Sequence, residues 1–265
     1  MNSHRHGDGG VTGVPGAGED VVCREPADPE TRVRGGVFDR RAFLVAGMGS
    51  LLASCGWDGG DALKPAMQAA AGFNDQVSGL LFSDAKLARK YGPAQRSLSF
   101  PNYFISGMTP QLDQPEAWRL EVGGMVRSPL SMTLDEIRSL SRLTYTVKHH
   151  CVEGWSAIAT WTGTPLRAIA EHAGVAPGAR YVRFDSFDSG YYNGWDIASA
   201  LHPETIIAWG FNDRELMADH GAPLRLYAPH KLGYKLTKYV TRITFTSDRP
   251  GGYWEDQGYP WFGGI

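Results

Sequence analysis

Short apolar runs, several of them alternating with polar residues, constrain the fold of this chain more than any other feature. Successive side chains of a β-strand point to opposite faces, so alternation with a period of two is typical of a half-buried strand. Glycine and proline separate the runs; the chain has 33 glycines and 16 prolines among 265 residues, and both favour turns. We therefore expect many short strands rather than a helical bundle. The strand-like runs are 118–122, 143–147, 180–187, 205–210, 223–229 and 239–246.

Two segments have the pattern of short helices instead. In SMTLDEIRSL, Thr133 is a candidate N-cap and Glu136 stands at the capping-box position. Thr164-Pro165-Leu166 opens a second predicted helix, LRAIAEHA, which ends at Gly174. FNDREL (211–216) is predicted to be the turn between two strands. The fold class that follows is α+β, rich in strands, with short helices at its edge.

The beginning of the chain does not have the composition of a folded domain. Residues 1–36 carry few large apolar groups, so they cannot form a core. The pair Arg40-Arg41 is followed by Phe43-Leu44 and an apolar run of roughly ten to thirteen residues, too short for a bilayer span of about 20. This arrangement resembles a twin-arginine export signal. We predict a leader over 1–54, a tether with one short helix over 55–95, a domain over 96–250 and a tail over 251–265.

Two further expectations concern the ends of the leader. A translation start at Val33 or Val37 would make residues 1–36 an annotation artefact. Leu52-Ala53-Ser54-Cys55 resembles a lipoprotein box, which would make Cys55 a lipid anchor at a membrane surface. Cleavage after the alanines of PAMQAAA (65–71) is the alternative. Either processing predicts a periplasmic or other envelope location, reached through the twin-arginine translocase.

The cysteines narrow the chemistry. Of Cys23, Cys55 and Cys151, only Cys151 would remain as a free thiol in an exported domain, and an odd thiol in an oxidising compartment is buried and inert, reactive, or a metal ligand. His149 and His150 precede it, but on an extended strand they point to opposite faces. Zinc usually takes three or four protein ligands. A single soft thiolate therefore suggests a metal whose other ligands come from a cofactor.

The residues around Cys151 carry a resemblance. CVEGWS (151–156) followed by WTGTPL (161–166) resembles the molybdenum-binding loop of the sulfite oxidase family, in the branch that contains the catalytic subunit of periplasmic methionine sulfoxide reductase. The resemblance implies a molybdopterin-binding domain of the sulfite oxidase type. It also implies that Cys151 binds the molybdenum of one molybdenum–molybdopterin cofactor per chain, with Trp155 beside it and Tyr191, or its neighbour Tyr192, near the metal.

The same resemblance assigns cofactor contacts along the chain. The segment 225–238 suits a phosphate, because phosphate is bound by cations and by closely approaching backbone N–H groups. Gly233 permits such an approach, and the cations of the segment are Arg225, Lys231, Lys235 and Lys238. The full set of cofactor-binding residues that the resemblance implies is Asn102, Ile105, Ser106, Ser186, His220, Arg225, Leu236, Thr237 and Lys238.

The reaction follows less directly. Gly154, Trp155 and Ser156 stand where sulfite oxidases have arginines, which favours a neutral substrate: reduction of a sulfoxide, such as methionine sulfoxide, or of an N-oxide. A sulfite-type dehydrogenase is the alternative, and a non-catalytic binding lipoprotein is a third. The sequence has no Cys-x-x-Cys-His haem motif, so we expect electrons from a separate membrane haem protein or cytochrome. The net charge is −2, so nucleic-acid binding is not expected. We also expect the protein to be a monomer.

Overall fold

The computed structural model describes residues 60–112, 114–188 and 190–265. The expectations for the leader, including Arg40-Arg41, and for Cys55 lie outside these residues. None of the described helices combines the length and the apolar character needed to cross a membrane. The helices are α2 (Gly60–Leu81), α3 (Leu134–Ser139), α4 (Leu166–Ala173) and α5 (Ile197–Ala200), with short 3-10 turns η1 (Pro93–Gln95), η2 (Ala218–His220), η3 (Gly233–Lys235) and η4 (Glu255–Gln257).

The strands form two five-stranded sheets. In the first the order is β2-β1-β10-β5-β6, and β1 pairs with β10 in parallel while the other neighbours are antiparallel. In the second the order is β3-β4-β7-β8, and β9 pairs with β7. The bounds are β1 (Leu120–Gly124), β2 (Leu130–Met132), β3 (Leu143–His150), β4 (Ser156–Pro165), β5 (Tyr181–Ser186), β6 (Tyr192–Asp196), β7 (Ile206–Phe211), β8 (Arg214–Glu215), β9 (Arg225–Tyr227) and β10 (Val240–Thr246).

Both sheets contribute to one hydrophobic core. Val122 of β1 and Phe245 of β10 belong to the same cluster of buried side chains as Val147 of β3, Trp161 of β4 and Ile207 of β7. Burial of large apolar side chains is the main favourable term in folding, worth about 25 cal/mol per Å² removed from water. The core therefore joins the two sheets into the single support on which the loops described below are held.

The predicted α+β class with short helices is confirmed. Thr133 caps α3, its hydroxyl accepts from the Glu136 N–H at 3.2 Å, and the Glu136 carboxylate accepts from the Thr133 N–H at 2.7 Å. Gly174 ends α4 in the left-handed conformation at φ 68°. The predicted helix LRAIAEHA is α4, Leu166–Ala173, with Pro165 as the residue before its first turn.

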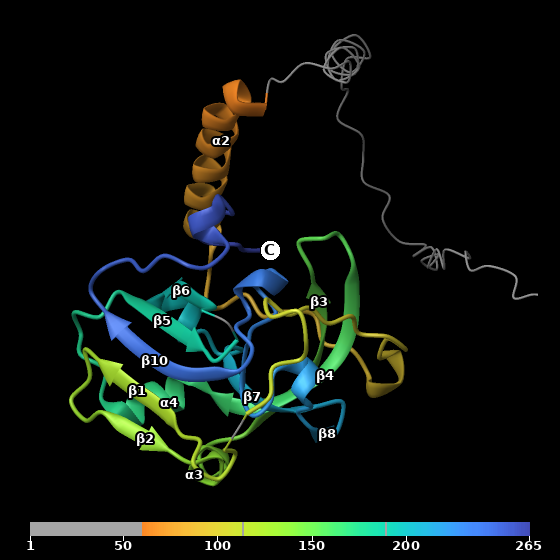
Figure 1. Cartoon of the computed structure of the whole chain (residues 1–265), viewed down its shortest axis with the longest axis vertical. Helices are drawn as coiled ribbons and strands as arrows, with labels where there is room; N and C mark the ends of the chain where they lie inside the picture. The colour runs from red at the N-terminus through yellow and green to blue at the C-terminus, as the bar shows by residue number, and fades with distance from the viewer. Residues whose placement is uncertain (1–59, 113, 189) are drawn as a thin grey trace, which may run out of the picture. The chain divides into compact units, whose positions relative to one another are not determined.

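The strand β4 itself was not predicted. Residues 161–164 are buried on both faces of the strand, so they show no alternation, and a short run without alternation cannot be told from a helix start. In Figure 1, β3 and β4 are the long green hairpin, which forms one edge of the second sheet. The predicted turn in FNDREL lies at Asn212 and Asp213, which have φ of 49° and 64° and connect β7 to the short β8.

Segments on both sides of the predicted domain are attached to it. The Tyr91 N–H donates to the Thr146 carbonyl at 2.9 Å, so residues assigned to the tether already pair with β3. α2 has 22 residues and is not short, and its Asp75 accepts from the Phe262 N–H at 3.0 Å. In the structure the segment 251–265 is therefore packed against α2 and the sheets.

Candidate functional site

Cys151 lies at the tip of the β3–β4 hairpin. The Cys151 N–H donates to the Trp155 carbonyl at 3.0 Å, and the Gly154 N–H donates to the Cys151 carbonyl at 3.2 Å. Gly154 has φ 91°, a conformation that glycine adopts without the steric cost other residues meet. The glycine of CVEGWS thus closes a five-residue loop that holds the thiol beside the end of a strand.

A cavity of about 460 Å³ opens next to this loop. That volume lies within the range of small-molecule and cofactor sites, roughly 300–1,000 Å³. Both sheets contribute to it: Cys151 and Arg225 come from the second sheet, and Asp188, Tyr191 and Lys238 from segments next to strands of the first. Side chains from both sheets therefore line the same cavity, and one ligand could contact both sheets.

Eight of the predicted site residues line this cavity. These residues come from widely separated parts of the sequence and are Asn102, Ile105, Cys151, Trp155, Tyr191, Arg225, Leu236 and Lys238.

The other four predicted residues, Ser106, Ser186, His220 and Thr237, lie outside the cavity lining. The Ser186 hydroxyl donates to the Lys238 carbonyl at 2.8 Å. The His220 ring packs on Phe211 with ring centroids 4.3 Å apart. Thr237 is fully buried, and its hydroxyl has no hydrogen-bond partner.

Asp188, which the sequence did not single out, fixes the 101–106 wall. Its carboxylate is buried and accepts from the Ile105 and Ser106 N–H groups, both at 3.0 Å, and from the Ser106 hydroxyl at 2.7 Å. Buried carboxylates require such partners, because an unsatisfied one is strongly disfavoured. Ser106 therefore anchors this wall to the β5–β6 connection. The signal in the sequence was a polar pair, Asp188-Ser189, directly after a strand.

Of the four cations that the sequence suggested for a phosphate, Arg225 and Lys238 line the cavity, whereas Lys231 and Lys235 are buried elsewhere in ion pairs. Arg225 is 6% exposed; its Nη1 donates to the His220 carbonyl at 3.3 Å, and its Nε has no partner. Burial lowers the pKa of Arg225 to about 10, which leaves it charged at neutral pH. Burial and the charge of Arg225 lower the pKa of Lys238 to about 7. A buried cation and a lysine whose pKa it lowers favour an anionic ligand between them.

The surroundings of Cys151 have the opposite character. Its Sγ lies 3.6 Å from Glu153 Oε2, which also accepts from Trp155 Nε1 at 2.9 Å. Burial, with a contribution from Glu153, raises the pKa of the Cys151 thiol. Burial and the charge of Arg225 lower the pKa of His149 to about 3, so this cavity-lining ring is uncharged at neutral pH. The space beside Cys151 is thus aromatic and weakly acidic.

The structure separates the two tyrosines that the sequence left as alternatives. Tyr191 lines the cavity, whereas the Tyr192 hydroxyl donates to the exposed Asp256. The Tyr191 hydroxyl donates to the Tyr234 carbonyl, and burial raises the pKa of Tyr191. In this arrangement Tyr191 braces the loop that follows β9, and its proton is directed to that carbonyl.

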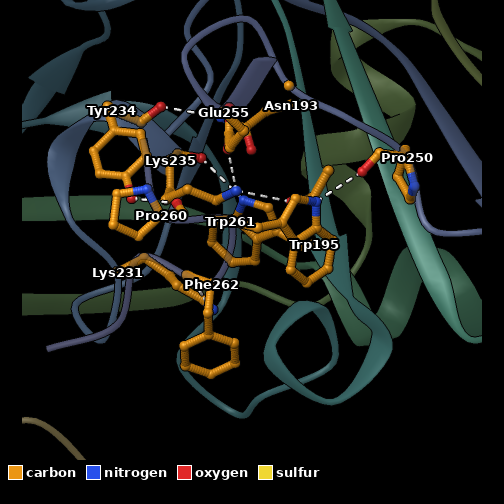
Figure 2. A network of polar contacts seen from close by, with 12 residues as sticks. Asn193, Trp195, Lys231, Tyr234, Lys235, Pro250, Glu255, Pro260, Trp261 and Phe262 are labelled. Atoms are coloured by element: carbon orange, nitrogen blue, oxygen red, sulfur yellow. Dashed lines mark hydrogen bonds and ion pairs between the residues drawn. The ribbon is translucent and has the colours of Figure 1, made fainter. Parts of the chain in front are cut away.

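A second wall was missed by the sequence analysis. Trp254 and Tyr259, from the segment assigned to the tail, line the cavity together with Gly233 and Tyr234. Figure 2 shows the polar network behind this wall: Lys235 reaches Glu255, and Tyr234 reaches Pro260. The partners are far apart in the sequence, and no local pattern marks either of them. The only sequence signal was the density of aromatic residues between 253 and 262.

Comparison with known proteins gives a consistent set of similarities. The model of the family described as "Oxidoreductase molybdopterin binding domain" matches residues 106–254. A protein of Azospira oryzae with the name "Putative protein-methionine-sulfoxide reductase subunit YedZ1" is 39% identical over 231 residues, covering 85% of this chain and 87% of that protein. The protein-methionine-sulfoxide reductase catalytic subunit of Campylobacter jejuni is 27% identical, covering 82% and 76%.

A solved structure shares the fold. The sulfane dehydrogenase SoxCD of Paracoccus pantotrophus superposes with a TM-score of 0.50 and 21% identity, covering 53% of this chain and 41% of that one. At this identity the likeness concerns the arrangement of the chain and says nothing of its substrate.

Proposed function

The chain belongs to the oxidoreductase molybdopterin binding domain family, and from this membership we propose that it is an exported enzyme that reduces a sulfoxide, with Cys151 as the protein ligand of a molybdenum–pterin cofactor. The observation that carries the proposal is the division of the cavity into two halves. One half has the two cations Arg225 and Lys238. The other surrounds Cys151 with aromatic rings, an uncharged His149 and the carboxylate of Glu153, and has no cation among the described lining residues.

The described residues fit the cofactor. The unpartnered Nε of Arg225 and the depressed pKa of Lys238 are what a phosphate group would relieve, because phosphate pairs strongly with buried cations. A side chain at Gly233 would place its Cβ 3.0 Å from His149 Nε2 and 3.6 Å from the Cys151 Cα, so glycine keeps this floor open. Cys151 supplies a soft donor. One cavity with one such cysteine supports one cofactor per chain.

Each part of the cavity then has a defined task. The cofactor, when bound, supplies two-electron oxygen-atom transfer. Arg225 and Lys238 would hold its phosphate end, and Asn102 would contact it from the wall that Asp188 fixes. Trp155, fixed by its hydrogen bond to Glu153, forms a flat wall beside the thiol and limits water there. Tyr191 and Asn193, whose amide donates to the Tyr234 carbonyl at 3.0 Å, keep the loop after β9 in place.

A sulfoxide suits this surround better than sulfite does. Sulfite is an anion, and bringing it into a partly buried site without a cation costs several kcal/mol. The cations among the described lining residues are Arg225 and Lys238, and the cofactor phosphate would neutralise both. Glu153 adds a negative group close to Cys151. The two similar proteins named as methionine-sulfoxide reductase subunits support the same choice.

The substrate preference can be reversed in part by one substitution. In dye-coupled assays of the molybdenum-loaded protein we expect reduction of methionine sulfoxide, dimethyl sulfoxide or trimethylamine N-oxide, and sulfite oxidation at a small fraction of that rate. Trp155→Arg should lower the KM for sulfite roughly fivefold, as an added ion pair of ~1 kcal/mol would, and should reduce sulfoxide turnover.

A matched control adds the same charge elsewhere. Met217 is half exposed and lies outside the cavity lining, so Met217→Arg should change neither activity. A wild-type protein that oxidises sulfite efficiently at pH 8 and leaves every sulfoxide and N-oxide unreduced would replace this function by that of a sulfite dehydrogenase.

Electrons for the reduction come from a separate redox protein in this proposal. The chain has no haem-attachment motif, and an oxidoreductase that carries only the molybdenum cofactor needs an external donor for two electrons per turnover. A membrane haem protein or a soluble cytochrome fits that role.

The proposed envelope location depends on Arg40 and Arg41. Transport of the already folded protein would allow the cofactor to be inserted before export. We expect the double variant Arg40→Lys, Arg41→Lys to accumulate as uncleaved precursor in the cytoplasm, as measured by fractionation and immunoblotting. The matched pair Arg32→Lys, Arg34→Lys should be exported normally. Normal export of the first variant would remove the signal assignment while leaving the enzymatic proposal intact.

A further inference from the structure

The outer wall of the cavity is a cluster of aromatic rings. Trp254 lies 5.3 Å from Tyr259 and 6.4 Å from Tyr103, measured between ring centroids. All three residues line the cavity. Tyr103 is 59% and Tyr259 38% exposed, so the cluster stands at the solvent side of the cavity, where a substrate must enter.

A buried ion pair stands directly behind this wall. Glu255 follows Trp254 in the chain and pairs with Lys235; the two side chains are 3% and 0% exposed. Lys235 Nζ also donates to the Gly194 carbonyl at 2.9 Å. Figure 2 shows Lys235 between Glu255 and the indole of Trp261. Removing one member of such a pair leaves the other charge buried and unpaired, which is strongly unfavourable.

The backbone is shaped to bring this pair together. A side chain at Gly252 would collide with the Glu255 carboxylate, and one at Gly194 would lie 2.7 Å from the Gly251 carbonyl oxygen. The Tyr234 hydroxyl donates to the Pro260 carbonyl at 2.6 Å and attaches the other end of the segment. The segment 250–260 is therefore held by specific contacts at several points.

Lys235 also belongs to the loop on the cofactor side. Its neighbours Tyr234 and Leu236 both line the cavity. Its carbonyl accepts from Trp195 Nε1 at 3.0 Å, which ties this loop to β6. One side chain thus links the inner lining of the cavity to its outer aromatic wall.

We propose that Lys235 and Glu255 are positioning residues that hold Trp254 and Tyr259 as the surface on which the methyl and methylene groups of the sulfoxide substrate pack. These groups are apolar even though the S=O group is polar, and they gain from burial against aromatic rings. The inference rests on the proposed sulfoxide reduction. It adds a specificity surface outside the metal-binding loop, on a part of the chain that the sequence marks as a tail.

The test is a double-mutant cycle on the cofactor-loaded protein, with methionine sulfoxide as the substrate. Trp254→Ala removes the wall, and Glu255→Gln removes the charge that positions it. Each should raise KM roughly five- to tenfold, the size of the lost burial of one or two methyl or methylene groups, with kcat changed less than about twofold. If the pair acts through Trp254, the double variant should have no higher KM than Trp254→Ala alone, because the effects of coupled residues are not additive. Asp248→Asn removes an exposed carboxylate from the approach to this segment and should leave KM unchanged.

A second measurement needs neither substrate nor turnover. Limited chymotrypsin digestion should cut Glu255→Gln faster than wild type within 253–262, because the aromatic cleavage sites there are released from the network. Additive KM effects, an unchanged KM in Trp254→Ala, or an unchanged cleavage rate in Glu255→Gln would each overturn the proposal. If Glu255→Gln does not fold, Trp254→Ala still decides whether the wall binds the substrate. Absence of sulfoxide reduction in the wild type would instead count against the proposed function, while the digestion result would still report on the pair.

Discussion

Replacing Cys151 by serine lowers sulfoxide turnover by at least about 10³-fold, which corresponds to ~4 kcal/mol of transition-state stabilisation. A hydroxyl is a harder and far less acidic donor than a thiol, so it does not replace a soft ligand on the metal. The thiol is only partly buried, and its one side-chain neighbour within hydrogen-bonding range is Glu153, at 3.6 Å. The thermal unfolding midpoint of the cofactor-free protein should therefore be nearly unchanged.

Metal analysis tests whether the lost turnover of Cys151→Ser comes from a change at the metal. The wild type should contain about one molybdenum per chain, and Cys151→Ser should contain less or bind it in an inactive form. Wild-type turnover by the serine variant, or zinc or copper in place of molybdenum in the wild-type protein, would refute the role given to Cys151.

Replacing Arg225 by methionine should cost most of the bound cofactor. A charge-assisted hydrogen bond to phosphate is worth about 1.5–3 kcal/mol, so we expect affinity to fall roughly 10- to 150-fold and the cofactor to be lost during gel filtration. Lys238→Met should have a smaller effect, because burial and Arg225 lower the pKa of Lys238 to about 7 and it carries only part of a charge at neutral pH.

The substitution Arg225→Met should not destabilise the cofactor-free protein, although it weakens cofactor binding. Without a phosphate, Arg225 is a buried cation with an unpartnered Nε, and an apolar side chain of similar length removes that penalty. The unfolding midpoint of the cofactor-free Arg225→Met protein should equal or exceed that of the wild type, while the loaded form is destabilised. Arg242→Met, on the exposed face of β10, is the matched control and should retain the cofactor. Wild-type cofactor content in Arg225→Met would contradict the phosphate assignment.

Features encoded within a few residues could be read from the sequence. The capping box at Thr133 and Glu136 requires only a spacing of three, and the structure has both of its hydrogen bonds. Gly174 likewise ends α4 through its own conformation. The alternation that predicted β3 also placed His149 and Cys151 on one face, and both line the cavity.

Features that depend on distant partners could not be read in this way. Asp188 matters because its carboxylate meets the N–H groups of Ile105 and Ser106, more than 80 positions earlier. Glu255 matters because a lysine elsewhere in the chain is buried against it. Neither residue stands in a periodic pattern, so composition and spacing assigned one to a loop and the other to a tail. The strand β4 was not predicted because it is buried on both faces, which removes the alternation of apolar and polar residues that indicates a strand.

The cavity is bounded by both sheets, and this arrangement has a consequence for the fate of the chain in the cell. A ligand that contacts Cys151 and Arg225 on one side and Lys238 on the other would connect the two sheets. At a free ligand concentration of a hundred times its Kd, its binding would add about 2.7 kcal/mol to the free energy of unfolding. Molecules that never receive the ligand lack this stabilisation and therefore unfold more often. Cellular proteases cleave unfolded molecules, so they would degrade the ligand-free protein faster than the ligand-bound protein. The surviving molecules would then be enriched in ligand-bound protein without a separate quality-control factor.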